Sequence, residues 1–350
     1  IRDHWADLSA LPWWAREDLD VAAQAAWRGA VAQALEGDWA VLPAARPRAA
    51  RESLRLEPRA DGVYLVDGAT GGARRLRAPE VGGWTAHGAV ESVHPERPPE
   101  TVEEVEARIP APAPLDARRY REEGRADLAD ALLAGAYAGL YPIRHVSAPL
   151  WGCYGLWGYE GLMVRIATAP DLVAAACDRF LALALRDVKE AAILGATGVF
   201  IEDCLTDQIG LPAFRRLNVA YLRPLTEAIR AVAMQSIYYY CGDPAGKWEA
   251  LLDVGADALA LEESKKGFTL DVEEAVERVG GRCALLGNLD AIDLLPHATE
   301  DALAAEIRRQ IAAGRRNGGR FVMSLGSPVT PGTSVERVRT YCRLARALGA

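Results

Sequence analysis

Short apolar segments alternate with longer segments of helical pattern from about residue 144 to the end of the chain. The apolar segments are RHVSAPL (144–150), TGVFIED (197–203), MQSIYYYC (234–241), DALALEE (257–263), RCALLGNLD (282–290) and GRFVMSLG (319–326). They are apolar through the middle and separated by helices. This pattern predicts the strands of a parallel sheet that helices cover on both faces, or that closes into a barrel.

Residues typical of helix ends support this alternation. Thr168 with Asp171, and Thr333 with Glu336, have the spacing of a capping box, in which two side chains satisfy the first free amides of a helix. Gly195 stands where a glycine that ends a helix is expected. We therefore expect one helix to begin near residue 169, another near residue 334, and a helix end near residue 195.

One module of the chain is used twice. GATGVFIED and GADALALEE both run from Gly-Ala through an apolar strand to a pair of acids. The first acid follows the glycine by the same spacing in both, from Gly195 to Glu202 and from Gly255 to Glu262. Such reuse indicates a repeated strand and helix unit.

Polar groups appear almost only where these strands end. They are Glu202, Asp203, Cys241, Asp243, Glu262, Glu263, Asn288, Asp290, Ser324 and Ser327. In a (β/α)8 barrel all these ends lie at one rim, where active sites are built. An open doubly wound sheet is the alternative, but no GxGxxG follows the first strand. We predict an α/β fold, a (β/α)8 TIM barrel.

The first 115 residues differ from the rest. WRGAVAQALEGDWAVLPAARP predicts a helix and a short strand, DGVYLVDGATGGARRLRAP predicts a β-hairpin, and the Pro-rich IPAPAPLD follows. We predict one domain over residues 1–350, with an N-terminal helical and β-hairpin extension (1–115) and the barrel body (116–350).

Composition excludes some classes of function. The formal net charge of -8 argues against a nucleic-acid partner. No apolar run approaches the roughly 20 residues that span a bilayer, and the first residues are unlike a signal peptide, so we expect a cytoplasmic protein. The six cysteines are scattered, which favours reduced thiols.

The C-terminal two thirds resembles a known superfamily. IEDCLTDQIGLPAFRRLNVAYLRPLTEAIR, YCGD, LLGNLDAIDLL and SLGSPVTPGTSVERVR have the order and spacing of the uroporphyrinogen decarboxylase superfamily. That superfamily contains the decarboxylase and the cobalamin-dependent methyltransferases, which pass methyl groups between a corrinoid and a thiol. The resemblance implies a TIM barrel, which agrees with the strand pattern.

The methyltransferase branch implies a zinc site. Its His-x-Cys and a later Cys bind zinc, which holds a thiol as thiolate. Here Cys241 matches the first Cys, Tyr239 stands in place of the His, and Ser327 falls near the later Cys. The resemblance thus implies Cys241 as a metal ligand. Carboxylates such as Glu202 could supply oxygen ligands in place of the missing ones, since zinc accepts carboxylates. The corrinoid would arrive on a separate protein, because the chain has no Asp-x-His-x-x-Gly signature.

The decarboxylase branch is the alternative, as a metal-independent lyase. Its Arg-rich N-terminal motif is absent, and GSP at 326–328 replaces its late GHG. Arginines matter there because guanidinium groups pair bidentately with substrate carboxylates. A third alternative is a ligand-binding barrel without activity. The replacements Tyr239 and Ser327 favour this alternative.

The candidate residues follow from these arguments. For catalysis they are Glu202, Asp203, Tyr239, Glu262 and Glu263; for a small-molecule substrate they are Trp151, Tyr154, Trp157, Tyr240, Asn288, Asp290 and Ser327.

Several alternatives stay open. The acids could cap helices or pair with Lys265 and Lys266, Asp290 could cap a helix, and Cys241 could be a buried thiol. The tryptophans and tyrosines of PLWGCYGLWGYEG are expected in a glycine-rich loop, against a flat ligand or against the hairpin. His145 begins a strand and is expected away from the rim. A homo-oligomer is compatible with the sequence.

Overall fold

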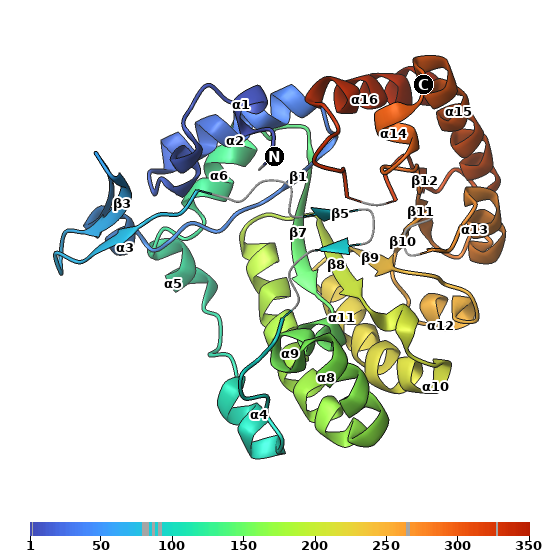
Figure 1. Ribbon diagram of the computed structural model, residues 1–350, viewed down its shortest axis with the longest axis horizontal. Coiled ribbons are helices and arrows are strands. Elements are labelled where there is room, and N and C mark those ends of the chain that lie inside the picture. Colours follow the sequence, from blue (N-terminus) through green and yellow to red (C-terminus); the bar gives the residue numbers. More distant parts are fainter. Residues whose placement is uncertain (2, 79–83, 86–87, 90–92, 264–266, 327) are drawn as a thin grey trace.

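Seven parallel strands form one curled sheet at the centre of the computed structural model, which describes residues 1, 3–78, 84–85, 88–89, 93–263, 267–326 and 328–350 (Figure 1). The strand order is β1-β7-β8-β9-β10-β11-β12. The strands are β1 (Trp39–Val41), β7 (Tyr141–Ser147), β8 (Gly198–Cys204), β9 (Gln235–Cys241), β10 (Ala258–Leu261), β11 (Ala284–Leu286) and β12 (Phe321–Val322). This confirms the parallel α/β prediction and its strand positions.

The barrel is open in the described part of the chain, where this sheet has seven strands instead of the eight expected. No described residue pairs β12 with β1, and both edge strands are short. Helix α16 (Val335–Gly349) lies beside α2 (Val21–Leu35) at this gap (Figure 1). Arg346 pairs with Asp38 at 2.7 Å and Arg339 with Glu36 at 3.2 Å, so the last helix is tied to the turn before β1.

Helices surround the sheet. Besides α2 and α16 they are α1 (Trp5–Leu8), α3 (Arg48–Ser53), α4 (Val102–Arg108), α5 (Ala117–Glu122), α6 (Asp127–Ala134), α7 (Pro149–Gly152), α8 (Tyr154–Thr168), α9 (Pro170–Ile193), α10 (Leu211–Phe214), α11 (Ala220–Ala231), α12 (Trp248–Leu252), α13 (Val272–Val279), α14 (Leu294–His297) and α15 (Glu300–Arg316), with the 3-10 turns η1 (Trp13–Glu17) and η2 (Thr206–Gln208) and the π-helical turn η3 (Arg215–Val219). Among the described helices, none combines the length and apolar composition that a bilayer crossing requires.

Helix α13 shows how the sequence specifies these helices. Its buried residues Val272, Ala275, Val276 and Val279 recur every three or four positions, which places them on one face. Asp271 caps the helix by accepting a hydrogen bond from the amide of residue 273. The apolar spacing and the cap therefore agree.

The expected helix ends are confirmed to within one residue, with α9 beginning at Pro170 and α16 at Val335, but the capping residues differ. Gly195 has φ +84° just after α9, as a glycine that ends a helix should. Thr168 is not a cap, because its hydroxyl donates to Val164 O and α9 begins at a proline. The cap of α16 is Ser334 instead of Thr333. Both errors are of one or two residues, the usual uncertainty of helix boundaries.

The N-terminal residues contribute strands to all three sheets of the described residues. Strand β1 pairs in parallel with β7, so the large sheet begins inside the segment predicted as an extension. The predicted hairpin is confirmed as β3 (Gly62–Asp67) and β4 (Ala73–Arg75), and β2 (Leu54–Arg59) adds a third antiparallel strand. A short ladder joins β5 (Trp84–Thr85) and β6 (Gly88–Ala89). Residue 115 is therefore no boundary of the large sheet.

The predicted glycine-rich loop after β7 is wrong, because this segment forms α7 and α8. Leu162 and Ile166 are buried one helical turn apart, and this apolar face outweighs the low helix propensity of glycine. Two helical segments meet at Gly158, which has φ 68° and ψ -174°. A Cβ there would collide with the backbone oxygen of Val93. Glycine at 158 thus lets the 93–99 segment pack closely on α8.

We expect Gly158→Ala to lower the free energy of unfolding by about 1 to 3 kcal/mol, because this backbone region is open only to glycine. The matched control is Gly155→Ala in the same helix, where a Cβ meets nothing within 4 Å. The control should leave stability unchanged or raise it by up to about 1 kcal/mol. Urea denaturation measures both, and equal effects would contradict the role of the kink.

Candidate active site at the carboxyl ends of the strands

Alternation along β8 and β9 divides their residues between two faces of the sheet. One face packs on the helices through the main core, which includes Val199, Ile201, Tyr238 and Tyr240. The concave inner face carries a smaller apolar cluster of Ile237, Ala258, Ala260 and Leu286, with Tyr141, Phe200, Tyr239 and Ala284 packed against it. Because successive side chains point to opposite faces, Glu202 and Cys204 share the inner face with Phe200.

The parallel register aligns the inner-face residues of neighbouring strands, so that they lie side by side at successive levels of the sheet. Glu202 of β8 is opposite Tyr239 of β9, and Cys204 is opposite Cys241. Glu262 follows β10 on the same inner face, one residue beyond the pair Leu261 and Tyr240. The register therefore places Glu202, Tyr239, Cys241 and Glu262 on one inner face, and their roles stay a prediction.

Two thiols lie together at this mouth. A hydrogen bond to Cys241 raises the pKa of the Cys204 thiol, and burial raises it further. Cys241 is 6% exposed and Cys204 is half-buried. None of the six cysteines forms a disulfide, as predicted. We did not select Cys204 from the sequence, although IEDC and YYYC both end a strand on a cysteine, and parallel neighbours align such ends.

Tyr239 and Glu262 form a polar pair beside the thiols. The Tyr239 hydroxyl donates to Glu262 Oε1 at 3.3 Å. Burial raises the pKa of Tyr239, and the nearby Cys241 and Glu262 raise it further, so the phenol is neutral at physiological pH. Because its one proton is donated to Glu262, the Tyr239 hydroxyl oxygen can accept a hydrogen bond from a substrate.

Aromatic rings form the level below the acids. The ring of Phe200 lies 4.9 Å from His145, 5.5 Å from Tyr239 and 5.7 Å from Trp39, measured between centroids. His145 is opposite Phe200 in the register, near the end of β7, and burial lowers its pKa. The expectation that His145 lies away from the rim is wrong, because β7 begins three residues before Arg144.

Asp203 faces the helices instead of the mouth. Its Oδ2 accepts hydrogen bonds from Tyr238 Oη at 2.6 Å, Asn218 Nδ2 at 2.8 Å and Thr206 Oγ1 at 3.0 Å. Burial raises its pKa to about 6, although these hydrogen bonds oppose the rise. The prediction that Asp203 shares the mouth with Glu202 is therefore wrong.

Tyr240 lies on the same outer face as Asp203. Its ring packs edge-on against Phe214 at 5.9 Å, and its hydroxyl donates to Asp243 O at 3.3 Å. Tyr240 is fully buried in the main core. It therefore does not face the mouth, contrary to its assignment to the substrate site.

The polar residues after β10 and β11 mainly brace the backbone. Asn288 Nδ2 donates to Leu270 O at 2.7 Å, and Asp290 Oδ1 accepts from the amides of residues 292 and 293. This supports the capping alternative for Asp290. Glu263 is buried, and a Cβ on Gly326 would collide with its carboxylate. Ser327, Lys265 and Lys266 lie outside the described residues.

The three aromatic residues after β7 differ in exposure. Trp157 is buried, and its Nε1 donates to Pro99 O at 2.8 Å, so it packs against the N-terminal segment. Tyr154 accepts a hydrogen bond from the Val93 amide at 3.0 Å and stacks on Trp151, with ring centroids 5.0 Å apart. Trp151 and Tyr154 remain half-buried, and their contact with a substrate stays a prediction.

The family model for uroporphyrinogen decarboxylase (URO-D) matches residues 132–348. The chain belongs to the URO-D family. A uroporphyrinogen decarboxylase of Pseudomonas fluorescens is 31% identical over 161 residues, which cover 45% of this chain and 42% of the relative. One of Pseudomonas paraeruginosa is 33% identical over 163 residues, with the same coverage. This chain thus spans less than half the length of these curated relatives.

A solved methyltransferase from Methanosarcina mazei has the same fold. It aligns with 100% of this chain and 91% of its own, at a TM-score of 0.67 and 16% identity. Identity this low establishes a common fold and nothing finer.

The zinc expected for the methyltransferase branch of the URO-D superfamily finds no ready site in the described residues. They contain no group of three or more His, Cys, Asp or Glu side chains that could hold a metal ion. Cys204 and Cys241 supply two thiols, and a tyrosine occupies the place of the histidine. The present residues therefore do not fit a zinc centre, and no step below depends on one.

We expect Asp203→Asn to remove a pH dependence of stability. In the folded protein Asp203 keeps its proton up to about pH 6, whereas the unfolded chain releases it near 3.8. The folded state thus binds more protons between these values, so the free energy of unfolding falls as pH rises from about 4 to 6, by up to about 3 kcal/mol.

Asparagine can accept the same hydrogen bonds and carries no charge, so the variant should lack this decrease. Denaturation at pH 4 and pH 7 gives the difference between wild type and variant. If that difference is the same at both pH values, the buried charge is not the cause.

Proposed function

We propose that this URO-D family member is an enzyme that moves a methyl group between a small substrate and a corrinoid carried by a separate protein. The reaction centre is the mouth formed by Glu202, Cys204, Tyr239, Cys241 and Glu262. The methyltransferase of M. mazei, which shares the fold along the whole chain, supports this assignment. The observation that carries it is the thiol pair at the strand ends, flanked by carboxylates on one inner face.

The thiols suit a methyl group better than a carboxylated porphyrinogen. Sulfur is polarisable and makes favourable contacts with apolar groups. Neighbouring strands keep Cys204 and Cys241 close together, so the two thiols form one fixed side of the proposed site. Recognition of many substrate carboxylates would need arginines, and none of the inner-face residues described at the mouth is an arginine.

Methyl transfer requires a group that exchanges a proton at this place. When a thiol accepts a methyl group from a methylated corrinoid, a sulfur–carbon bond forms, the bonding electron pair stays on the corrinoid, and the thiol proton must leave. In the reverse direction the leaving group takes up a proton. Glu202 is half-buried on the inner face, and we assign this exchange to it. Tyr239, held by Glu262, would orient the substrate by accepting a hydrogen bond on its hydroxyl oxygen.

Decarboxylation is the second candidate. The curated relatives are uroporphyrinogen decarboxylases, and a neutral phenol such as Tyr239 can protonate the carbanion left by loss of CO2. The two reactions differ in their products. A corrinoid changes its absorbance on methyl transfer, whereas a decarboxylase releases CO2 from a carboxylated substrate.

We expect the wild-type protein to demethylate free methylcobalamin in the presence of a small thiol, measured by absorbance. Glu202→Gln should slow the reaction by roughly a hundredfold or more, as loss of a general acid or base does. The control is Glu227→Gln, an exposed residue of α11, which should keep the wild-type rate.

The same preparations separate the alternatives. Release of CO2 from uroporphyrinogen without any change in the corrinoid would establish the decarboxylase. Binding of methylcobalamin without turnover of either substrate would establish a ligand-binding barrel. Equal rates for Glu202→Gln and Glu227→Gln would remove Glu202 from the reaction.

A further inference from the structure

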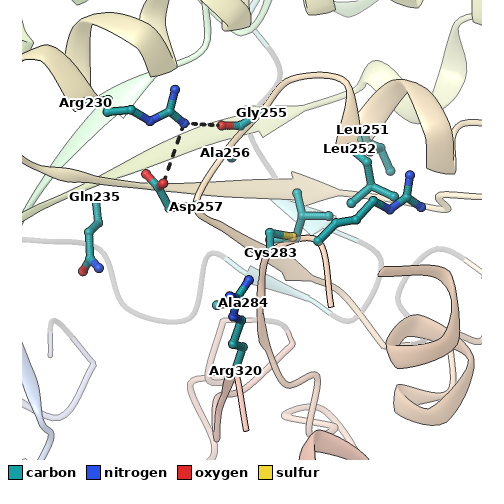
Figure 2. A pocket seen from close by; sticks show the side chains of 12 residues that line it. Arg230, Gln235, Leu251, Leu252, Gly255, Ala256, Asp257, Cys283, Ala284 and Arg320 are labelled. Carbon is teal, nitrogen blue, oxygen red and sulfur yellow. Dashed lines mark hydrogen bonds and ion pairs between the residues drawn. The ribbon is translucent and has the colours of Figure 1, made fainter. Parts of the chain in front are cut away.

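A pocket of about 450 Å³ lies at the end of the sheet opposite to the mouth (Figure 2). It is formed where β9, β10 and β11 begin, and its lining includes Arg230, Gln235, Asp257, Arg282, Cys283 and Arg320. Gln235 and Cys241 are the first and last residues of the seven-residue strand β9, which corresponds to about 20 Å of extended strand. The pocket is therefore separate from the candidate active site.

Positive charge dominates the lining of this pocket. Three guanidinium groups face one carboxylate, in a chain whose net charge is -8. Arg282 is already neutralised, because both its terminal nitrogens bind Glu249 at 2.8 and 3.1 Å. Asp257 is held by Ser236, whose amide and hydroxyl each donate to Oδ2 at 2.8 Å. Arg230 shares its charge with Asp257, whose Oδ1 lies 3.7 Å from Arg230 Nη2, whereas Arg320 has no carboxylate partner among the described residues.

Arg230 and Arg320 each have N–H donors that the described residues do not use. Arg320 donates from Nη1 to Gly281 O at 3.0 Å, and the described residues offer its other nitrogens no acceptor. Arg230 uses Nη2 for Gly255 O at 2.9 Å and lies 3.7 Å from Asp257 Oδ1. Figure 2 shows Arg230 at the top of the view and Arg320 at the bottom, with Asp257 and Cys283 between them. The donors thus approach the pocket from two sides.

Two further groups support convergence on the pocket. Gln235 accepts a hydrogen bond from Tyr141 on its Oε1 at 2.6 Å, which leaves its amide nitrogen as a donor. Burial raises the pKa of the Cys283 thiol to about 11, while the charges of Arg282 and Arg320 act to lower it. Both guanidinium groups therefore lie near this thiol.

We propose that this pocket binds a small organic anion that presents carboxylate or phosphate oxygens to Arg230 and Arg320. Guanidinium groups recognise both kinds of oxyanion through paired N–H donors. The volume is within the range of small-molecule sites and leaves room for an organic body beside the anionic group. Nothing in this proposal depends on methyl transfer at the mouth.

The test is titration calorimetry at low ionic strength, with citrate and pyrophosphate as the probes. We expect saturable binding of at least one probe to the wild-type protein. Arg320→Ala and Arg230→Ala should each weaken it by about tenfold or more, since each removes charge-assisted donors. Arg315→Ala is the control, because Arg315 is exposed on α15 and does not line the pocket.

The outcomes are separable from those at the mouth. Binding of citrate alone identifies a carboxylate site, and binding of pyrophosphate alone identifies a phosphate site. Glu202→Gln should bind the same probe as tightly as the wild type, whatever its methyl-transfer rate. Failure of both probes to bind, or equal weakening by Arg315→Ala and Arg320→Ala, would overturn the proposal.

Discussion

The parallel register of β8 and β9 is the constraint on which the candidate site depends. It aligns Glu202 with Tyr239 and Cys204 with Cys241, while strand alternation sends Asp203 and Tyr240 to the other face. A shift of one residue would exchange the two sets. The helix-facing set prevents such a shift, because Asp203, Tyr238 and Asn218 form a buried hydrogen-bonded group that fits only this register. The pairing of β8 with β9 therefore produces both the buried polar group on the outer face and the mouth on the inner face.

The sequence predicts where the strands end but not which face each residue takes. Strand 198–204 is apolar on both sides, with Val199 and Ile201 on one face and Phe200 on the other. A strand buried on both faces has no alternation of polar and apolar residues to reveal its orientation. Nothing in the sequence therefore indicates which of the adjacent acids Glu202 and Asp203 faces the mouth. The structure distinguishes them, because Glu202 lies on the inner face and Asp203 bonds to Tyr238 on the helix-facing side.

Elsewhere the errors came from local signals that tertiary packing overruled. Glycines suggested a loop after β7, but the apolar spacing of Leu162 and Ile166 gives a helix that tolerates them. His145 lies further along its strand than the apolar pattern indicated, because β7 starts earlier at Tyr141. The pocket at the other end of the sheet had no sequence signal, since Arg230 and Arg320 are 90 positions apart and meet only through the fold.

The contact between α16 and the turn before β1 also bears on the order of folding. Arg346 and Asp38 are 308 positions apart, so this closure must wait until residue 346 has left the ribosome. Until then Asp38, in the turn that leads into the edge strand β1, lacks its ion-pair partner on α16. Bare strand edges invite pairing with other chains. The turn before this edge strand is therefore braced only after α16 docks.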